Sequence, residues 1–130
     1  MKAFLYCRVA HNDDFCLAAQ AAALRQYAGQ AGYDIIGVAC EHSNGLTLNR
    51  PALHEVTKAV LAGKVDLVVV QSVARIGRDR SMTQQYIDLL TENNTKLLCI
   101  REQLIFSDQG EALIGGNKNA ECPSWETQIP

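Results

Sequence analysis

Two arginines follow a strongly apolar run in the middle of the chain, where their side chains could bind a phosphate. Five of the seven residues 65–71 are Val or Leu, which is typical of a buried strand, and Arg75 and Arg78 come shortly after them. The guanidinium group is always protonated and offers a planar fork of N–H donors that matches the oxygens of a phosphate. The segment therefore predicts an oxyanion site, although solvated arginines after a strand would give the same local pattern.

Two further arginines are expected at the same edge of the molecule. Arg8 lies near the end of an expected first strand, and Arg50 follows the loop after the second. The carboxyl ends of parallel strands meet at one edge of a sheet, and ligands bind at that edge. Arginines gathered there would repel one another. A polyanionic ligand therefore explains them more simply than pairing of single arginines with Glu41 and Asp79.

The elements that must position these arginines alternate along the chain. Short apolar runs rich in β-branched residues predict strands, and apolar residues three or four positions apart predict helices. Pro51 is a favourable first residue for a helix, because its missing N–H would be unpaired there in any case. Expected strands cover residues 3–9, 35–40, 65–71, 96–101 and a short 103–106, and expected helices cover 17–31, 51–62 and 81–92.

Strands that alternate with helices are typical of an α/β fold. We expect three layers, with a mostly parallel sheet of four to five strands and helices on both faces. The 130 residues are enough for one well-filled core, which we assign to residues 1–106. Residues 107–130 have an acidic balance, and Gly115, Gly116 and Pro123 disfavour a helix there, so we expect a disordered tail.

The composition excludes several classes of protein. The net charge is −2, with 48% hydrophobic and 20% charged residues, which is ordinary for a globular protein. This charge disfavours strong nonspecific binding to DNA, because contacts of Lys and Arg with phosphates supply most of that affinity. No apolar run is long enough to span a membrane and the N-terminus does not resemble a signal peptide, so we expect a cytoplasmic protein.

Five widely spaced cysteines without a CxxC pair are typical of free thiols in a reducing compartment. Cys7 and Cys99 lie within apolar strand patterns, where a thiol behaves as a small buried hydrophobic group. A zinc site would lack paired ligand spacing, so we expect neither a metal nor a cofactor. The side chains that such a site would draw on are His11, Cys16, Cys40 and His42.

Four segments of the chain resemble motifs of the serine recombinases, the resolvase and invertase group. Residues 6–9 resemble the opening Tyr-x-Arg-Val-Ser of that family, and residues 17–24 with Gln20 resemble its first helix. Residues 45–53 resemble its Gly-x-x-x-x-Arg-Pro-x-Leu loop, and residues 74–79 resemble its Asp-Arg-x-Gly-Arg-Asp signature. Four motifs in the right order and spacing are strong evidence, whereas one would be weak.

The resemblance implies the catalytic domain of a site-specific DNA recombinase. In that family a serine hydroxyl attacks a DNA phosphodiester, becomes linked to the 5′ phosphate and releases a 3′ hydroxyl before the strands are exchanged. The arginines that bind the scissile phosphate and stabilise the transition state, without a metal, fall on Arg8, Arg50, Arg75 and Arg78. The residues for which the resemblance implies contact with DNA are Arg8, Gln20, Arg50, Arg75, Arg78 and Arg80.

Two positions depart from the family pattern. Ala10 stands at the position of the nucleophile, and its methyl group has no atom that can attack phosphorus. Ala74 stands where the signature has Asp. Four other side chains could act as a nucleophile or a base, but none of them stands at the position of the family's serine. They are His11, Ser43, Ser72 and Ser81.

Three functions follow from these observations. An active recombinase is disfavoured by Ala10. A catalytically inactive member, whether a natural relict or an engineered form, would keep weak or nonspecific affinity for DNA, or affinity for a second copy or an active recombinase subunit. An unrelated α/β module that binds a nucleotide or another phosphorylated ligand would use the same arginines, but no Gly-rich phosphate loop joins a strand to a helix.

Overall fold

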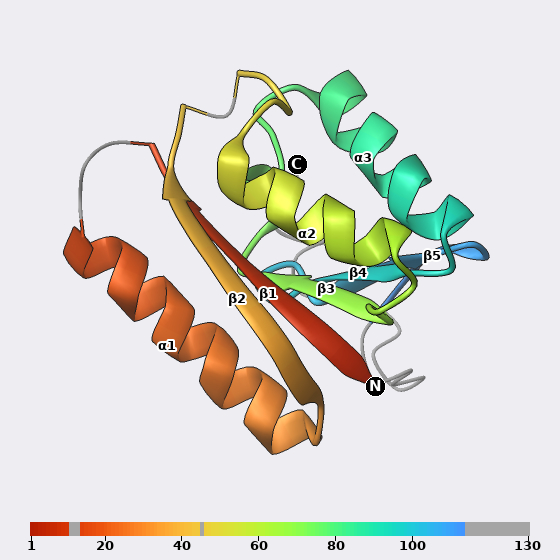
Figure 1. Cartoon of the computed structure of the whole chain (residues 1–130), viewed down its shortest axis with the longest axis horizontal. Helices are drawn as coiled ribbons and strands as arrows, with labels where there is room; N and C mark the ends of the chain where they lie inside the picture. Colours follow the sequence, from red (N-terminus) through yellow and green to blue (C-terminus); the bar gives the residue numbers. More distant parts are fainter. Residues whose placement is uncertain (11–13, 45, 114–130) are drawn as a thin grey trace, which may run out of the picture.

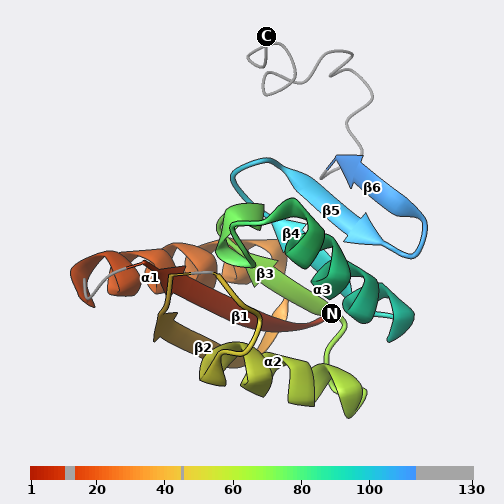
Figure 2. The ribbon, with the colours of Figure 1, turned by 90° about the horizontal axis from the view of Figure 1, so that it is seen from above.

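The computed structural model describes residues 1–10, 14–44 and 46–113, which form three layers (Figure 1). Within these residues the sheet has six strands in the order β2-β1-β3-β4-β5-β6. Helix α1 covers one face, and α2 and α3 cover the other (Figure 2). The predicted α/β fold with helices on both faces is therefore confirmed.

The observed elements lie close to the expected ones. The strands are β1 (Lys2–Val9), β2 (Asp34–His42), β3 (Leu67–Val70), β4 (Lys96–Cys99), β5 (Leu104–Ser107) and β6 (Gly110–Leu113). The helices are α1 (Asp14–Ala31), α2 (Pro51–Leu61) and α3 (Arg80–Glu92), with a short 3-10 helix η1 (Val73–Arg75) before α3. Strands β2, β1, β3 and β4 pair in parallel, and β5 and β6 are antiparallel. In the described part of the chain, no helix is long and apolar enough to cross a membrane.

The sheet separates two apolar layers of the core. Successive side chains of a strand point to opposite faces, so Leu5 of β1 packs with Leu24 of α1, whereas Tyr6 packs with Val56 of α2. Strand β3 lies at the centre and all four of its residues are buried, which explains its continuous apolar sequence. The turn that follows β3 consequently starts from a fully buried strand.

The C-terminal part of the described chain differs from the prediction. The sequence predicts a tail from residue 107, whereas the structure extends the sheet with β6, which pairs with β5. Ser107 pairs with Gly110 across a tight turn, and Gly110 has a φ of 98°, which favours glycine. Strand propensity did not reveal β6, because Gly, Glu and Ala are all poor strand formers. The remainder of the expected tail, residues 114–130, lies outside the described residues.

Candidate functional site

Arg8 joins three segments at the carboxyl edge of the sheet. Its side chain is only 4% exposed, although it carries a charge. Nε donates a hydrogen bond to the carbonyl oxygen of Arg75 (2.9 Å), Nη1 to that of Ser43 (2.6 Å) and Nη2 to that of Ala74 (2.8 Å). The guanidinium group thereby connects the end of β1 to the loops that follow β2 and β3.

Arg50 makes a second set of connections from the residue that precedes α2. It is 3% exposed, and its Nε donates to the carbonyl oxygen of Thr47 (2.8 Å). Nη1 donates to the hydroxyl of Tyr6 (2.8 Å) and to the carbonyl oxygen of Arg75 (3.3 Å), and Nη2 donates to the carbonyl oxygen of Ile76. The loop before α2 and the turn after β3 are therefore fixed to each other through one side chain.

The four predicted arginines share one electrostatic environment. Burial lowers the pKa of Arg8, and the positive charges of Arg50, Arg75 and Arg78 lower it further. The acceptors of Arg8 and Arg50 are backbone carbonyls and a tyrosine hydroxyl, all of them neutral. Among the described residues, the charges of Arg8 and Arg50 are therefore stabilised through hydrogen bonds to neutral dipoles.

The two acids that could have paired with these arginines make other contacts. Glu41 Oε2 accepts a hydrogen bond from the hydroxyl of Tyr6 (2.5 Å), and its Oε1 accepts one from the backbone N–H of Ala52 (3.0 Å). Asp79 caps α3, because it accepts a hydrogen bond from the backbone N–H of Ser81 (3.1 Å). Both carboxylates lie at the N-terminus of a helix, where negative charge is favourable.

Arg75 and Arg78 differ from the two buried arginines. Arg75 is half-buried and its Nη2 donates to Oε1 of Gln71 (3.2 Å), while its buried Nε has no acceptor among the described residues. Arg78 is exposed. The start of η1 is anchored separately, because Ser72 donates a hydrogen bond to the carboxylate of Glu102 (2.7 Å). The turn thus keeps donor capacity that its own structure does not use.

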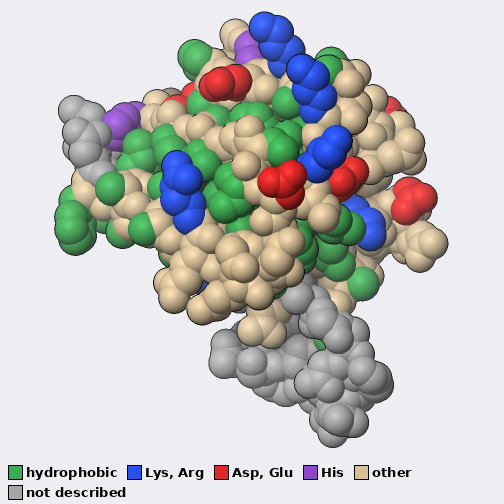
Figure 3. Space-filling view, turned by 60° about the horizontal axis from the view of Figure 1, so that its bottom comes forward, with side chains coloured by type: hydrophobic (Ala, Val, Ile, Leu, Met, Phe, Trp, Pro, Cys, Tyr) green, Lys and Arg blue, Asp and Glu red, His purple; other side chains and the backbone are tan. Residues whose placement is uncertain are grey.

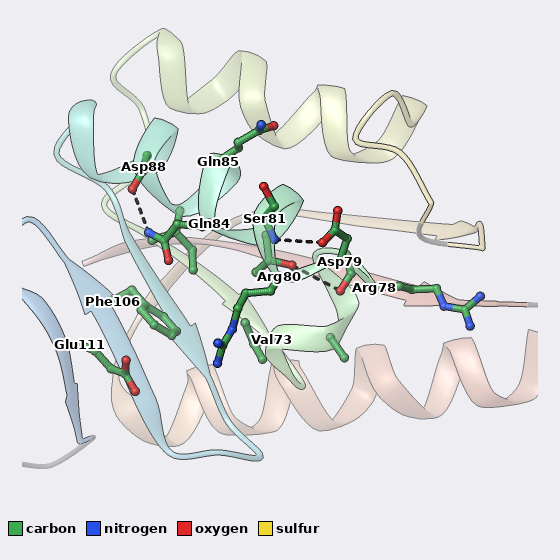
Figure 4. A pocket seen from close by; sticks show the side chains of 14 residues that line it. Val73, Arg78, Asp79, Arg80, Ser81, Gln84, Gln85, Asp88, Phe106 and Glu111 are labelled. Atoms are coloured by element: carbon green, nitrogen blue, oxygen red, sulfur yellow. Dashed lines mark hydrogen bonds between the residues drawn. The ribbon is translucent and has the colours of Figure 1, made fainter.

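Gln20 and Arg80, which are predicted to contact DNA, lie in different surroundings. Gln20 is 4% exposed; its Oε1 accepts from the backbone N–H of Arg8 (3.1 Å) and its Nε2 donates to the carbonyl oxygen of Arg8 (3.3 Å). It therefore connects α1 to β1 and positions Arg8. Arg80 is exposed, and Figure 4 shows that it extends toward Val73, whereas Arg78 extends away from it. Contact of Gln20 or Arg80 with DNA stays a prediction.

Ala10 directly follows β1 and is exposed at the same edge. The hydroxyls considered as substitutes for the missing nucleophile are differently placed: Ser72 is buried, and Ser81 is exposed at the start of α3. The backbone carbonyl oxygen of Ser43 accepts a hydrogen bond from Arg8. His11 lies outside the described residues.

An open groove of about 1080 Å³ borders the turn and runs along α3 toward β5 and β6 (Figure 4). Its lining carries both signs of charge, with Arg78 and Arg80 as well as Asp79, Asp88 and Glu111. The face in Figure 3 likewise shows Lys and Arg side chains interspersed with Asp and Glu. Among the residues that the structure describes, no group of three or more His, Cys, Asp or Glu side chains could hold a metal ion.

Sequence reasoning did not identify two positioning residues, Tyr6 and Glu102. The Tyr6 hydroxyl accepts a hydrogen bond from Arg50 and donates one to Glu41, which lie 44 and 35 residues away in the sequence. A hydroxyl inside an apolar strand must find partners when it is buried, and this requirement is a usable signal for Tyr6. We find no comparable signal in the sequence for Glu102.

Comparison with known proteins agrees with this architecture. Residues 3–116 match the family model of the resolvase N-terminal domain. The structure is similar to the N-terminal catalytic domain of TP901-1 integrase, with a TM-score of 0.74 and 23% identity over 85% of each chain. No curated protein sequence matches the chain significantly.

Two further solved structures share the fold. The C-terminal catalytic domain of ISC1926 TnpA, an IS607-like serine recombinase, has a TM-score of 0.73 and 26% identity, over 77% of this chain and 70% of that one. A resolvase family site-specific recombinase from Streptococcus pneumoniae has a TM-score of 0.66 and 19% identity, over 77% of this chain and 72% of that one. The family model covers most of the chain, and the resemblance found in the sequence is confirmed. This chain belongs to the resolvase family and has the fold of a serine recombinase catalytic domain.

Proposed function

We propose that this domain binds the phosphodiester backbone of DNA at its arginine-rich edge without cutting it. The observation that carries the proposal is the buried Nε of Arg75, which has no acceptor in the described part of the chain. A buried donor without a partner costs about 1–3 kcal/mol. An oxygen of a bound phosphate would supply the missing acceptor once the half-buried side chain of Arg75 turns toward the surface.

The surrounding charges support an anionic ligand. Arg8, Arg50, Arg75 and Arg78 lie near one another, and the acceptors of the two buried arginines are neutral. A phosphate would bring the negative charge that this edge lacks. Hydrogen bonds from a guanidinium group to phosphate are charge-assisted and often bidentate, which gives them about twice the strength of neutral ones.

The proposed site lacks the group that would attack the phosphate. A methyl group at position 10 cannot form a bond to phosphorus, and Ala74 removes the acid that the family signature has there. Arginines alone can bind a phosphate and stabilise developing charge, but they open no route to cleavage. Such a subunit would occupy DNA passively, either with a second copy of itself or beside an active recombinase subunit.

The affinity of this chain for DNA should be modest and only weakly dependent on salt. Arg75 and Arg78 are the two of these four arginines whose guanidinium groups are not buried against several backbone carbonyls, and the net charge of the chain is −2. For two neutralised phosphates, the logarithm of the binding constant should fall with the logarithm of the salt concentration with a slope of about −2. A titration of a labelled duplex at several salt concentrations measures this slope, and a value well below −4 would contradict the proposed contacts.

Restoring the missing groups tests the lack of cleavage. The chain and an Ala10→Ser, Ala74→Asp double variant are incubated with supercoiled DNA, and nicked DNA and covalent protein adducts are then measured. We expect adducts from the double variant alone. An Ala10→Val, Ala74→Asp variant is the matched control, because it lacks the hydroxyl. Adducts from the unaltered chain would show that another side chain attacks the phosphate and would refute the proposal.

The same preparation separates DNA binding from the alternative of a small-ligand module. If the chain fails to bind any duplex but a mononucleotide raises its melting temperature, the arginines hold a free phosphorylated ligand. In that case the proposal of DNA binding is wrong, although the anion site itself stands.

A further inference from the structure

Two cysteines face each other beside the arginine-rich edge. Cys7 of β1 and Cys40 of β2 are direct partners in the parallel pairing of these strands. Side chains of such partners lie on the same face of the sheet. Cys7 is completely buried and Cys40 is exposed, so one thiol of the pair is accessible to solvent and the other is not.

We propose that Cys7 and Cys40 are a thiol–disulfide site, which a small-molecule disulfide converts reversibly to an intramolecular disulfide. Neighbouring strands lie about 4.8 Å apart, within the range of about 4.4–6.8 Å that disulfides span between Cα atoms. The Cβ atoms of a disulfide lie only about 3.8 Å apart, so the bond would draw β2 toward β1. Strand β2 is at the edge of the sheet and can follow that movement more easily than a central strand.

Neither of the other two described cysteines stands opposite a second cysteine in the sheet. Cys99 of β4 faces Val70 and Leu104 on the neighbouring strands. Cys16 lies on α1 and is exposed. Within the described ranges, a pair of cysteines in strand register therefore occurs once, at the end of β1 and β2.

The oxidation proceeds by two thiol–disulfide exchanges. The Cys40 thiolate attacks one sulfur of oxidised glutathione, which forms a mixed disulfide and releases one glutathione thiolate. The Cys7 thiolate then attacks the Cys40 sulfur and expels the second glutathione thiolate. Two protein thiols are oxidised, one glutathione disulfide is reduced to two thiols, and the two protons that the cysteines lose are taken up by these thiols.

The second exchange should limit the rate. Burial and the neighbouring Cys40 thiol together raise the pKa of Cys7 to about 12, although Arg25 of α1 and Arg75 act in the opposite direction. The thiolate is the attacking species, so ring closure should accelerate about tenfold for each unit of pH between 7 and 9.

The disulfide would act on the arginine site through the next residue of each strand. Arg8 and Glu41 are also partners in register, and they follow Cys7 and Cys40 directly. Arg8 holds the loops after β2 and β3, and Glu41 accepts hydrogen bonds from Tyr6 and from the start of α2. We expect oxidation to shift these contacts and to lower the affinity for DNA at least about fivefold. This consequence rests on the proposed function, whereas the disulfide itself does not.

Peptide mapping tests the disulfide directly. The full chain is incubated with oxidised glutathione at pH 8, free thiols are alkylated in acid, and the chain is digested with trypsin. Each cysteine then lies on its own peptide: Cys7 on 3–8, Cys16 on 9–25, Cys40 on 26–58, Cys99 on 97–101 and Cys122 on 119–130. Peptide 26–58 stays intact at Arg50 because trypsin does not cut before proline.

We expect peptides 3–8 and 26–58 to be joined in the main product, and dithiothreitol to separate them. A Cys40→Ser variant should lose this product, and the matched control Cys16→Ser should keep it. A main product that joins any other two peptides, or a chain that retains glutathione on Cys40 with Cys7 free, would overturn the proposal.

A binding measurement separates the disulfide from its proposed effect. The reduced and the oxidised chain are titrated with the same labelled duplex. Equal affinity of both forms would overturn the coupling to the arginine site. If neither form binds while the joined peptides are present, the proposed function fails and the thiol–disulfide site stands.

Discussion

The pair Arg8 and Arg50 and the pair Arg75 and Arg78 make different kinds of contacts, although all four residues have the same side chain. Arg8 and Arg50 are at most 4% exposed and direct their donors to neutral acceptors within the protein. Arg75 keeps a buried N–H without an acceptor in the described residues, and Arg78 is exposed. In the structure the first pair holds neighbouring loops together, and we propose that the second pair contacts the ligand. A cluster of arginines in a sequence is therefore not by itself a set of ligand-binding groups.

The buried pair illustrates why arginine suits a structural role of this kind. One guanidinium group offers five N–H donors in a rigid plane and can serve several carbonyl oxygens at once. Lysine could reach one or two of them. Each carbonyl left without a donor inside the protein would lower the stability of the fold.

The largest effect on stability should come from Arg50. Arg50→Ala removes the donor from three backbone carbonyls and from the Tyr6 hydroxyl, so we expect the free energy of unfolding to fall by about 3 kcal/mol. Urea unfolding measures this change. Arg50→Lys is the control, because lysine keeps the positive charge but lacks the fork of N–H donors. Its free energy of unfolding should lie between those of the unaltered chain and the alanine variant. A loss below about 1 kcal/mol for the alanine variant would place Arg50 with the ligand-binding pair.

Tyr6→Phe should have a smaller effect that depends on pH. Near neutral pH we expect a loss of about 1–2 kcal/mol, because Arg50 and Glu41 both lose a partner. Burial and the hydrogen bond to Glu41 raise the pKa of Tyr6 above its usual value. The unfolded chain then ionises first, so Tyr6 favours the folded state fully below about pH 10 and this contribution is lost as the pH rises further.

The free energy of unfolding of Tyr6→Phe should therefore decline less steeply than that of the unaltered chain between pH 10 and 11. Tyr33→Phe, at a half-buried tyrosine outside the site, serves as the control. Parallel pH profiles for Tyr6→Phe and the unaltered chain would contradict the raised pKa of Tyr6.

Arg78→Ala should have the smallest effect on stability and a large one on binding. Its exposed side chain lets us expect a change of less than about 0.5 kcal/mol in the free energy of unfolding. The affinity for a DNA duplex should fall about tenfold, as for the loss of one charge-assisted contact. Arg25→Ala, at an exposed position on α1, is the matched control. An equal loss of affinity in both variants would contradict a specific contact of Arg78, because general attraction between the chain and DNA would then explain the binding.

The sequence was sufficient to predict the order of most strands and helices and to predict that the four arginines lie at one edge of the sheet. The apolar run of β3 and the Pro at the start of α2 are local signals, and the edge at which the strands end follows from the alternation of elements. Strand β6 was missed because its residues have no strand propensity of their own and depend on β5. Local signals of this kind predict elements well and edge strands poorly.

Which arginines hold the loops together and which keep unused donors was not predictable, because this depends on contacts between residues far apart in the sequence. Arg8 reaches carbonyls 35 to 67 positions away in the sequence, and the sequence does not say toward which loop the side chain turns. The motif predicts contact of Gln20 with DNA, which stays a prediction, and it does not reveal that the Gln20 amide hydrogen-bonds to the backbone of Arg8. A sequence motif indicates where a side chain lies in the fold, but it does not indicate which group that side chain contacts.

The carbonyl oxygen of Arg75 accepts hydrogen bonds from both buried arginines, while the side chain of the same residue keeps its spare donor. The backbone of this turn is thus held in place before any ligand arrives. Binding of an anion there would require little loss of conformational entropy from this turn, because its backbone is already held by these hydrogen bonds. If the proposed anion binds there, this turn would act as a preorganised receptor, and little of the binding free energy would be spent on ordering its backbone.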